Sequence, residues 1–155
     1  MKLTPAIKGL ITATGMIAIA LDTYYSGMQA DSPFQYLIYA VYALGISWTI
    51  TGWSKSASYT GKFGDAFGQG FRCFIVVTLL MVAFTGIFSK MHPEFAEESA
   101  VLYREQLQKE NSVLPAELDE RVDRYKRQYT ITLLSASIFG YLIIGAIVTA
   151  GISAI

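Results

Sequence analysis

The 155-residue chain has little of what catalytic and metal centres are built from. It contains one cysteine, Cys73, and one histidine, His92. A single cysteine excludes a disulfide within the chain, and one histidine without a second histidine or a cysteine at ligand spacing makes a poor zinc site. The sequence therefore predicts no metal, no cofactor and no catalytic residue.

Charge is also scarce, at 15% of the residues, and it is unevenly placed. Three long stretches contain no Asp, Glu, Lys or Arg: those between Asp31 and Lys55, between Arg72 and Lys90, and from Arg127 to the end. A hydrocarbon core of about 30 Å takes about 20 helical residues, whose backbone polar groups bond within the helix. Each stretch therefore predicts a membrane-spanning helix, which argues against a soluble enzyme.

A fourth, shorter apolar stretch lies between Lys8 and Asp22. We expect it to span as well, because Lys8 can snorkel to the interface and Tyr24 and Tyr25 suit the interfacial aromatic belt. A cleaved signal peptide is the alternative, but no small-residue cleavage site follows. The prediction is one all-α membrane domain, residues 1–155, with four transmembrane helices at about 5–25, 34–53, 67–90 and 129–152.

Most of the remaining charge lies in residues 91–128, where the periodicity becomes amphipathic. Leu114, Leu118 and Val122 recur at spacings of four, and Pro93 and Pro115 are each suited to the start of a helix. We predict an extramembrane charged helical hairpin at about 91–128, between the third and fourth spans, with its turn near Asn111 and Ser112.

The two arms of this hairpin carry complementary charges. Folding about residue 112 sets Glu97 opposite Arg127, Glu98 opposite Lys126, and Arg104 opposite Glu120. One interpretation is a solvated hairpin that pairs its own charges. The other is that an apolar stripe, which includes Phe95, Leu102, Leu107 and Leu118, docks a partner protein or a second copy.

Orientation follows from the basic residues. Lys2 and Lys8 precede the first span, Lys55 and Lys62 lie in the second loop, and the first loop has no Lys or Arg. The positive-inside rule then places both termini in the cytoplasm and the hairpin in the periplasm. The basic residues of the hairpin oppose this orientation, although acidic neighbours offset much of their charge.

Gly64 and Gly68 stand out in a glycine-rich stretch from Gly61 to Gly70. The stretch is not a phosphate-binding loop, because Lys62 lacks the preceding glycine spacing and a following Ser or Thr. Glycines four apart are typical of close helix packing, and Phe63 and Phe67 suit the membrane surface. Recognition of a lipid or a partner is the alternative.

Three ionisable residues near the spans are further candidates. Asp22 and Arg72 lie close to opposite membrane surfaces, where solvation explains them as well as function does. We interpret His92 as an interfacial structural residue, with proton transfer or partner binding as the alternative.

The glycine-rich stretch 61–70 and the Pro93-Glu94-Phe95 turn together resemble domain of unknown function 4199, a family of small inner-membrane proteins of Gram-negative bacteria. The resemblance covers nearly the whole chain in layout. It implies four spans, a charged hairpin and no catalytic residues to carry over. It also implies a membrane glycosyltransferase encoded nearby as a candidate partner.

Three functions remain open. The first is a non-catalytic accessory subunit of a membrane enzyme complex, with a polyprenyl-phosphate glycosyltransferase as the candidate enzyme. The second is a small oligomeric transporter or channel that uses Asp22, Arg72 or the tyrosines of the second span. The third is a lipid-modifying enzyme that uses His92 and Glu94. We expect membrane lipid and either another membrane protein or a second copy as partners, and no nucleic acid.

Overall fold

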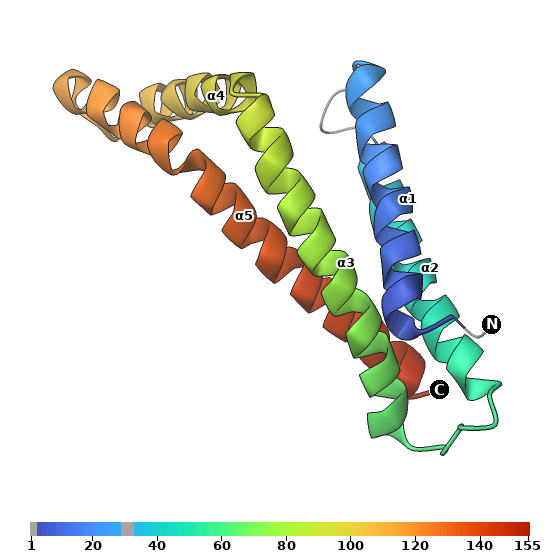
Figure 1. The fold of residues 1–155 in the computed structure, drawn as a ribbon. Helices are drawn as coiled ribbons and strands as arrows, with labels where there is room; N and C mark the ends of the chain where they lie inside the picture. The colour runs from blue at the N-terminus through green and yellow to red at the C-terminus, as the bar shows by residue number, and fades with distance from the viewer. Residues whose placement is uncertain (1–2, 29–32) are drawn as a thin grey trace. The chain divides into compact units, whose positions relative to one another are not determined.

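The computed structural model describes residues 3–28 and 33–155, and it contains five helices there and no strand (Figure 1). The prediction of an all-α chain is confirmed. In chain order the helices are α1 Pro5–Tyr25, α2 Phe34–Ser54, α3 Phe63–Met91, α4 Glu94–Glu110 and α5 Pro115–Ser153. The first two agree with the predicted spans to within one residue.

The third helix begins earlier than predicted. It starts at Phe63 rather than at residue 67, so residues 63–70 of the glycine-rich stretch are helical. Asp65 lies in the first turn, where a carboxylate meets the positive end of the helix dipole. The same carboxylate accepts a hydrogen bond from Thr60 Oγ1 at 2.6 Å, which ties the helix start to the preceding loop.

The last helix is longer than the predicted fourth span. α5 runs for 39 residues and joins the second arm of the hairpin to the C-terminal apolar stretch without a break. The sequence explains this continuity, because no proline or glycine occurs between Pro115 and Gly140 to interrupt the helix.

Among the described residues, three helices are long and apolar enough to cross a membrane: α1, α3 and α5. α2 matches α1 in length, at 21 residues, and carries no Asp, Glu, Lys or Arg. Its tyrosines and tryptophans lower its mean hydropathy, so composition supports three of the four predicted spans.

The chain forms two compact units. The bundle unit contains the described residues of 1–82 and 138–155, and therefore α1, α2, most of α3 and the end of α5. The hairpin unit contains residues 83–137, which include α4 and the first part of α5.

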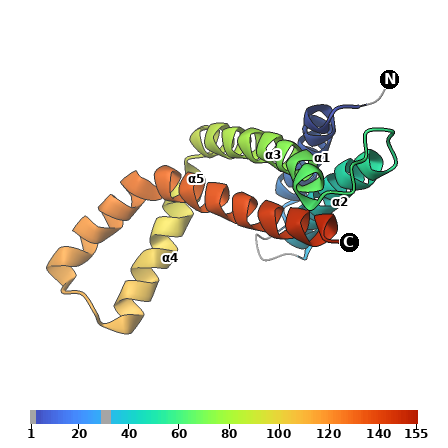
Figure 2. The same cartoon turned by 90° about the horizontal axis from the view of Figure 1, so that it is seen from below.

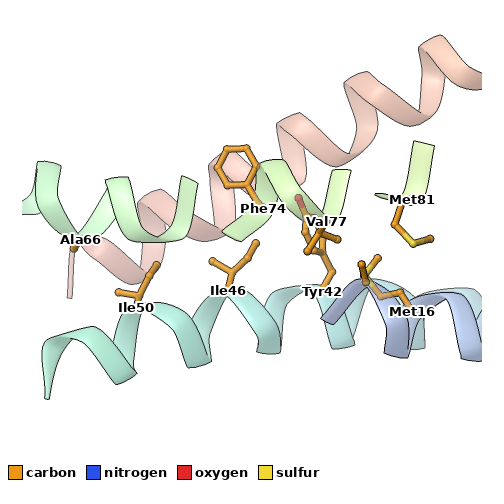
Figure 3. Close-up of a cluster of buried hydrophobic side chains, with 9 residues drawn as sticks. Met16, Tyr42, Ile46, Ile50, Ala66, Phe74, Val77 and Met81 are labelled. Carbon is orange, nitrogen blue, oxygen red and sulfur yellow. The ribbon is translucent and has the colours of Figure 1, made fainter. Parts of the chain in front are cut away.

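The bundle unit is packed around side chains from its helices (Figure 3). Met16 of α1, Tyr42 and Ile46 of α2, and Phe74 and Val77 of α3 are all buried. The buried Tyr42 hydroxyl donates a hydrogen bond to the carbonyl of Tyr141 in α5, at 2.9 Å. Van der Waals packing and interhelical hydrogen bonds of this kind hold helices together where lipid replaces water.

Glycines bring the helices of the bundle unit close together. At five of them an added Cβ would collide with a neighbouring helix: Gly9 with Cys73, Gly45 with Thr12, Gly52 with Lys8, Gly70 with Thr149, and Gly145 with Phe74. Gly64 and Gly68 do not pack this way, because a Cβ at either would meet no atom within 4 Å. The predicted close packing at Gly64 and Gly68 is therefore wrong within this chain.

The burial of the Lys8 side chain within the bundle unit was not expected from the sequence. This side chain is only 9% exposed, and its ammonium donates a hydrogen bond to the carbonyl of Trp48 at 3.3 Å. Gly52 makes room for the ammonium, since a Cβ there would lie 2.5 Å from Lys8 Nζ.

Candidate functional site on the helical hairpin

The hairpin unit contains the predicted antiparallel pair of arms. α4 lies beside the N-terminal part of α5, as the two views show (Figure 2). The turn falls where predicted, because α4 ends at Glu110 and Asn111 caps it in the left-handed conformation, with φ of 46°. Asparagine adopts this conformation more readily than most residues, so it suits the helix end.

The arms pair their charges, but one residue away from the predicted register. Lys126 contacts Glu97 at 3.1 Å, and Arg104 contacts Asp119. The predicted partners were Arg127 for Glu97 and Glu120 for Arg104. The shift arises because the turn is centred between residues 111 and 112 rather than on 112.

These ion pairs are exposed and contribute modestly. Within α5, Arg124 contacts Glu120 at 2.9 Å, at the spacing of four residues that brings side chains together on a helix. Exposed pairs of this kind contribute about 0–1 kcal/mol each. They fix the register of the arms more than they stabilise them.

The interior of the hairpin is aromatic and apolar. Tyr103 of α4 stacks on Tyr125 of α5, with ring centroids 4.4 Å apart and planes 12° from parallel. Leu107 and Leu118 are 7% and 8% exposed. Both were assigned to a docking stripe, but they lie buried in the hairpin core, because their helix faces point towards the opposite arm.

A shallow groove of about 330 Å³ runs along one side of the hairpin. Small apolar side chains line it: Ala100, Val101 and Val122. Charged residues of both signs surround them: Glu97, Arg104, Asp123 and Lys126. An apolar centre with a polar rim is the usual anatomy of a protein–protein interface.

A second apolar position lies on the outer face of α4. Leu102 is 66% exposed, compared with 56% for Val101. Phe95 is seven residues, or two helical turns, before Leu102, so both lie on this face, and Phe95 is half-buried. Of the predicted stripe, Leu102 is therefore the member most accessible to a partner.

His92 and Phe95 form part of a cluster where α3 gives way to α4. His92 Nδ1 lies 2.8 Å from Glu94 Oε1, and its ring is 4.4 Å from that of Phe88. Phe95 adds a further ring 5.9 Å from Phe88. The histidine and the carboxylate are thus brought together as the lipid-modifying hypothesis required. The same contacts also stabilise the junction between α3 and α4 at Pro93.

The other predicted candidates lie in the bundle unit. Asp22 and Arg72 are exposed on α1 and α3. Gly64 and Gly68 face space that no other part of the described chain fills. Among the residues that the structure describes, no three of His, Cys, Asp or Glu gather as metal ligands. Functional roles for these four positions stay predictions.

Sequence reasoning missed Val101 as an accessible apolar residue. The sequence offered only a weak indication that Val101 is accessible: it lies between Ala100 and Leu102 in an otherwise charged helix. Periodicity alone could not separate the buried Ala100 from the exposed Val101, because that depends on where the second arm packs.

Three helices long and apolar enough to cross a membrane suggest a multi-pass helical membrane protein, with a charged hairpin between two of them, α3 and α5. The chain belongs to the family described as protein of unknown function (DUF4199), which matches residues 7–155. No curated protein and no solved structure matches it.

Proposed function

We propose that the protein is a non-catalytic accessory subunit, anchored in the membrane, that binds a partner membrane protein through its hairpin unit. One observation carries the proposal. The arms of the hairpin already pair their charges with each other, yet Val101 and Leu102 remain more than half exposed. Apolar side chains on a charged segment are stabilised when a partner covers them.

The groove indicates what kind of surface the partner presents. Its small apolar centre suits one or two apolar side chains of a helix, and its rim of both signs suits flanking charges of both signs. The partner class that the family resemblance implies is a polyprenyl-phosphate glycosyltransferase of the bacterial inner membrane, which is the first partner to test.

The proposal includes α2 as a fourth span. Its 21 residues extend about 32 Å at 1.5 Å per residue, which is enough for a hydrocarbon core of about 30 Å. Within the bundle unit, the start of α1 and the end of α5 lie at the same end (Figure 1). Both termini are then cytoplasmic and the hairpin periplasmic, as the basic residues near the N-terminus favour.

Affinity purification in mild detergent, followed by mass spectrometry, tests the partner proposal. The wild-type protein should retain a membrane enzyme at stoichiometric level. Purified enzyme should then rebind the purified subunit. Changing Val101 and Leu102 together to serine should weaken this rebinding at least about tenfold, because burying an apolar side chain of this size contributes about 1.5 kcal/mol or more.

Two control variants separate binding from folding. Gln108→Ser changes an exposed polar residue of the same helix and should leave rebinding unchanged. Leu118→Ser removes a buried side chain and should disrupt the hairpin itself. Recovery of the protein alone as a defined homo-oligomer, or full rebinding by the Val101 and Leu102 double variant, would contradict the proposal.

A further inference from the structure

A pocket of about 470 Å³ lies in the bundle unit, where α1 begins and α2 ends. Lys8 of α1, Trp48 and Gly52 of α2, and Gln69 of α3 line it, together with Lys55, which directly follows α2. Four hydroxyl-bearing residues also contribute: Thr4, Thr49, Ser56 and Ser58. No acidic residue is among the described residues of the lining, so its side chains carry positive charge alone.

This composition differs from that of an ordinary lipid-facing hollow in the same unit. Another hollow of about 390 Å³ is lined by apolar residues only: Ala6, Ile7, Leu10, Val76, Leu79 and Leu80. Lipid acyl chains alone can cover that apolar surface. The pocket at Lys8 gathers two cations and several hydrogen-bond donors, which acyl chains cannot satisfy.

Lys8 is the central feature of the pocket. Its ammonium is buried, donates to the Trp48 carbonyl at 3.3 Å and lies 5.0 Å from the centroid of the Trp48 ring. An ammonium has three N–H groups, and one carbonyl is not a counter-charge. A buried cation is costly without an anion nearby. An anion that enters the pocket would supply this missing charge.

Ser56, another residue of the lining, carries one of four buried hydroxyl groups in the described residues that have no hydrogen-bond partner. Buried hydroxyl groups are normally hydrogen-bonded. Thr4 and Pro5 add the N-terminal end of α1, where the helix dipole favours an anion, although Thr4 Oγ1 already accepts a hydrogen bond from the Ile7 N–H. A phosphate group, with several acceptor oxygens and negative charge, can accept charge-assisted hydrogen bonds from the Lys8 ammonium in this pocket.

The tryptophans indicate that the phosphate belongs to a lipid. Trp48 and Trp53 both line the pocket, and Trp53 packs edge-on against Tyr59 with ring centroids 5.2 Å apart. Tryptophan and tyrosine concentrate at the level of lipid headgroups. We propose that this pocket binds the phosphate of an anionic lipid headgroup, held chiefly by Lys8. The site is separate from the hairpin, so it does not depend on the partner-binding proposal.

Intrinsic fluorescence tests this directly, because Trp48 and Trp53 are the protein's two tryptophans. The purified full chain in micelles of an uncharged detergent is titrated with three probes: short-chain phosphatidylglycerol, short-chain phosphatidylcholine and inorganic phosphate. We expect a saturable change with phosphatidylglycerol, and affinities at least about tenfold weaker for the other two. Equal binding of phosphatidylcholine would overturn the requirement for net negative charge, and equal binding of inorganic phosphate would overturn the assignment to a lipid.

Two pairs of variants locate the site. Lys8→Gln should weaken phosphatidylglycerol binding at least about tenfold, since charge-assisted hydrogen bonds are lost. Lys62→Gln removes an exposed lysine that does not line the pocket, and it should change the affinity less than about twofold, as expected for a screened surface charge. Equal losses in the two variants would overturn the proposal in favour of general surface attraction.

The second pair keeps every charge and so covers the case in which Lys8→Gln fails to fold. Gly52→Ala places a methyl group against the Lys8 ammonium and should weaken binding at least about threefold by displacing it. Gly64→Ala introduces the same methyl group into open space and should bind as the wild type does. Circular dichroism and gel filtration establish that both are folded. Wild-type affinity in a folded Gly52→Ala protein would overturn the central role of Lys8.

Discussion

The bundle unit and the hairpin unit of this chain are held together by different means. In the bundle unit, glycines let helices approach closely around Met16, Tyr42 and Phe74. In the hairpin unit, exposed ion pairs and a stacked pair of tyrosines accompany buried leucines. The difference matches the two solvents expected for them. In lipid, close packing replaces the hydrophobic effect, whereas in water buried leucines drive association and charges remain at the surface.

The largest effect should come from the hairpin core. Leu118→Ala is expected to destabilise the hairpin by about 2–3 kcal/mol, because it removes buried methyl groups and leaves a cavity. Leu114→Ala, at a position 68% exposed, is the matched control and should change stability by less than about 0.5 kcal/mol. Amide hydrogen exchange of residues 94–128 measures both. Equal effects would show that the hairpin is not held by its buried leucines.

Close packing in the bundle unit should be the next most sensitive feature. Gly145→Ala is expected to lower stability by about 1–3 kcal/mol, because its methyl group would collide with the Phe74 ring. Gly140→Ala lies on the same helix in open space and should be neutral or slightly stabilising. Thermal unfolding in detergent compares the two variants. A neutral Gly145→Ala would mean that the helices are not as close as described.

Charge pairing in the hairpin unit should have a smaller effect. A double-mutant cycle with Glu97→Gln and Lys126→Gln is expected to give a coupling free energy of about 0.2–1 kcal/mol, as for other exposed pairs. The coupling should decrease at 1 M salt, where the screening length falls to about 3 Å. The cycle repeated with Arg127→Gln in place of Lys126→Gln should show weaker coupling. A stronger coupling of Glu97 to Arg127 than to Lys126 would favour the register predicted from the sequence.

The smallest effect is expected at Asp22. This exposed carboxylate lies in the last turn of α1, where the dipole disfavours negative charge, so Asp22→Asn should stabilise the helix by about 0.3 kcal/mol. Unfolding in detergent measures the shift in stability.

Flux assays in vesicles with the same Asp22→Asn variant test the transporter hypothesis. A flux that depends on Asp22 would support transport and contradict the accessory role.

The sequence predicted the helices where local chemistry defines them. Residues 5–25 form α1 as expected, because Pro5 opens the helix and an apolar stretch follows it. The hairpin turn was predicted near Asn111 because Pro93 and Pro115 each start a helix, and Asn111 suits the left-handed helix end observed there. The start of α3 was placed four residues too late, because the contribution of Asp65 to its first turn was not recognised.

Contacts between helices could not be predicted in the same way. Gly64 and Gly68 have the spacing of a packing motif, yet Gly45 and Gly145 make the close contacts. Which glycine faces a neighbour depends on the rotation and crossing of each helix, which no local pattern encodes. The burial of Lys8 was missed for the same reason, since it depends on Gly52 and Trp48, forty or more positions away in the chain.

The crossing of α2 is the point on which the proposed arrangement depends most, and cysteine labelling tests it most directly. In a Cys73→Ser background, single cysteines replace Ser26, Ser58 and Ser112, all exposed. Cells are treated with a membrane-impermeant maleimide before and after permeabilisation. The account predicts labelling at positions 26 and 112 in intact cells, and at position 58 only after permeabilisation. Labelling of positions 26 and 58 from the same side would contradict it, because α2 would then not cross the membrane.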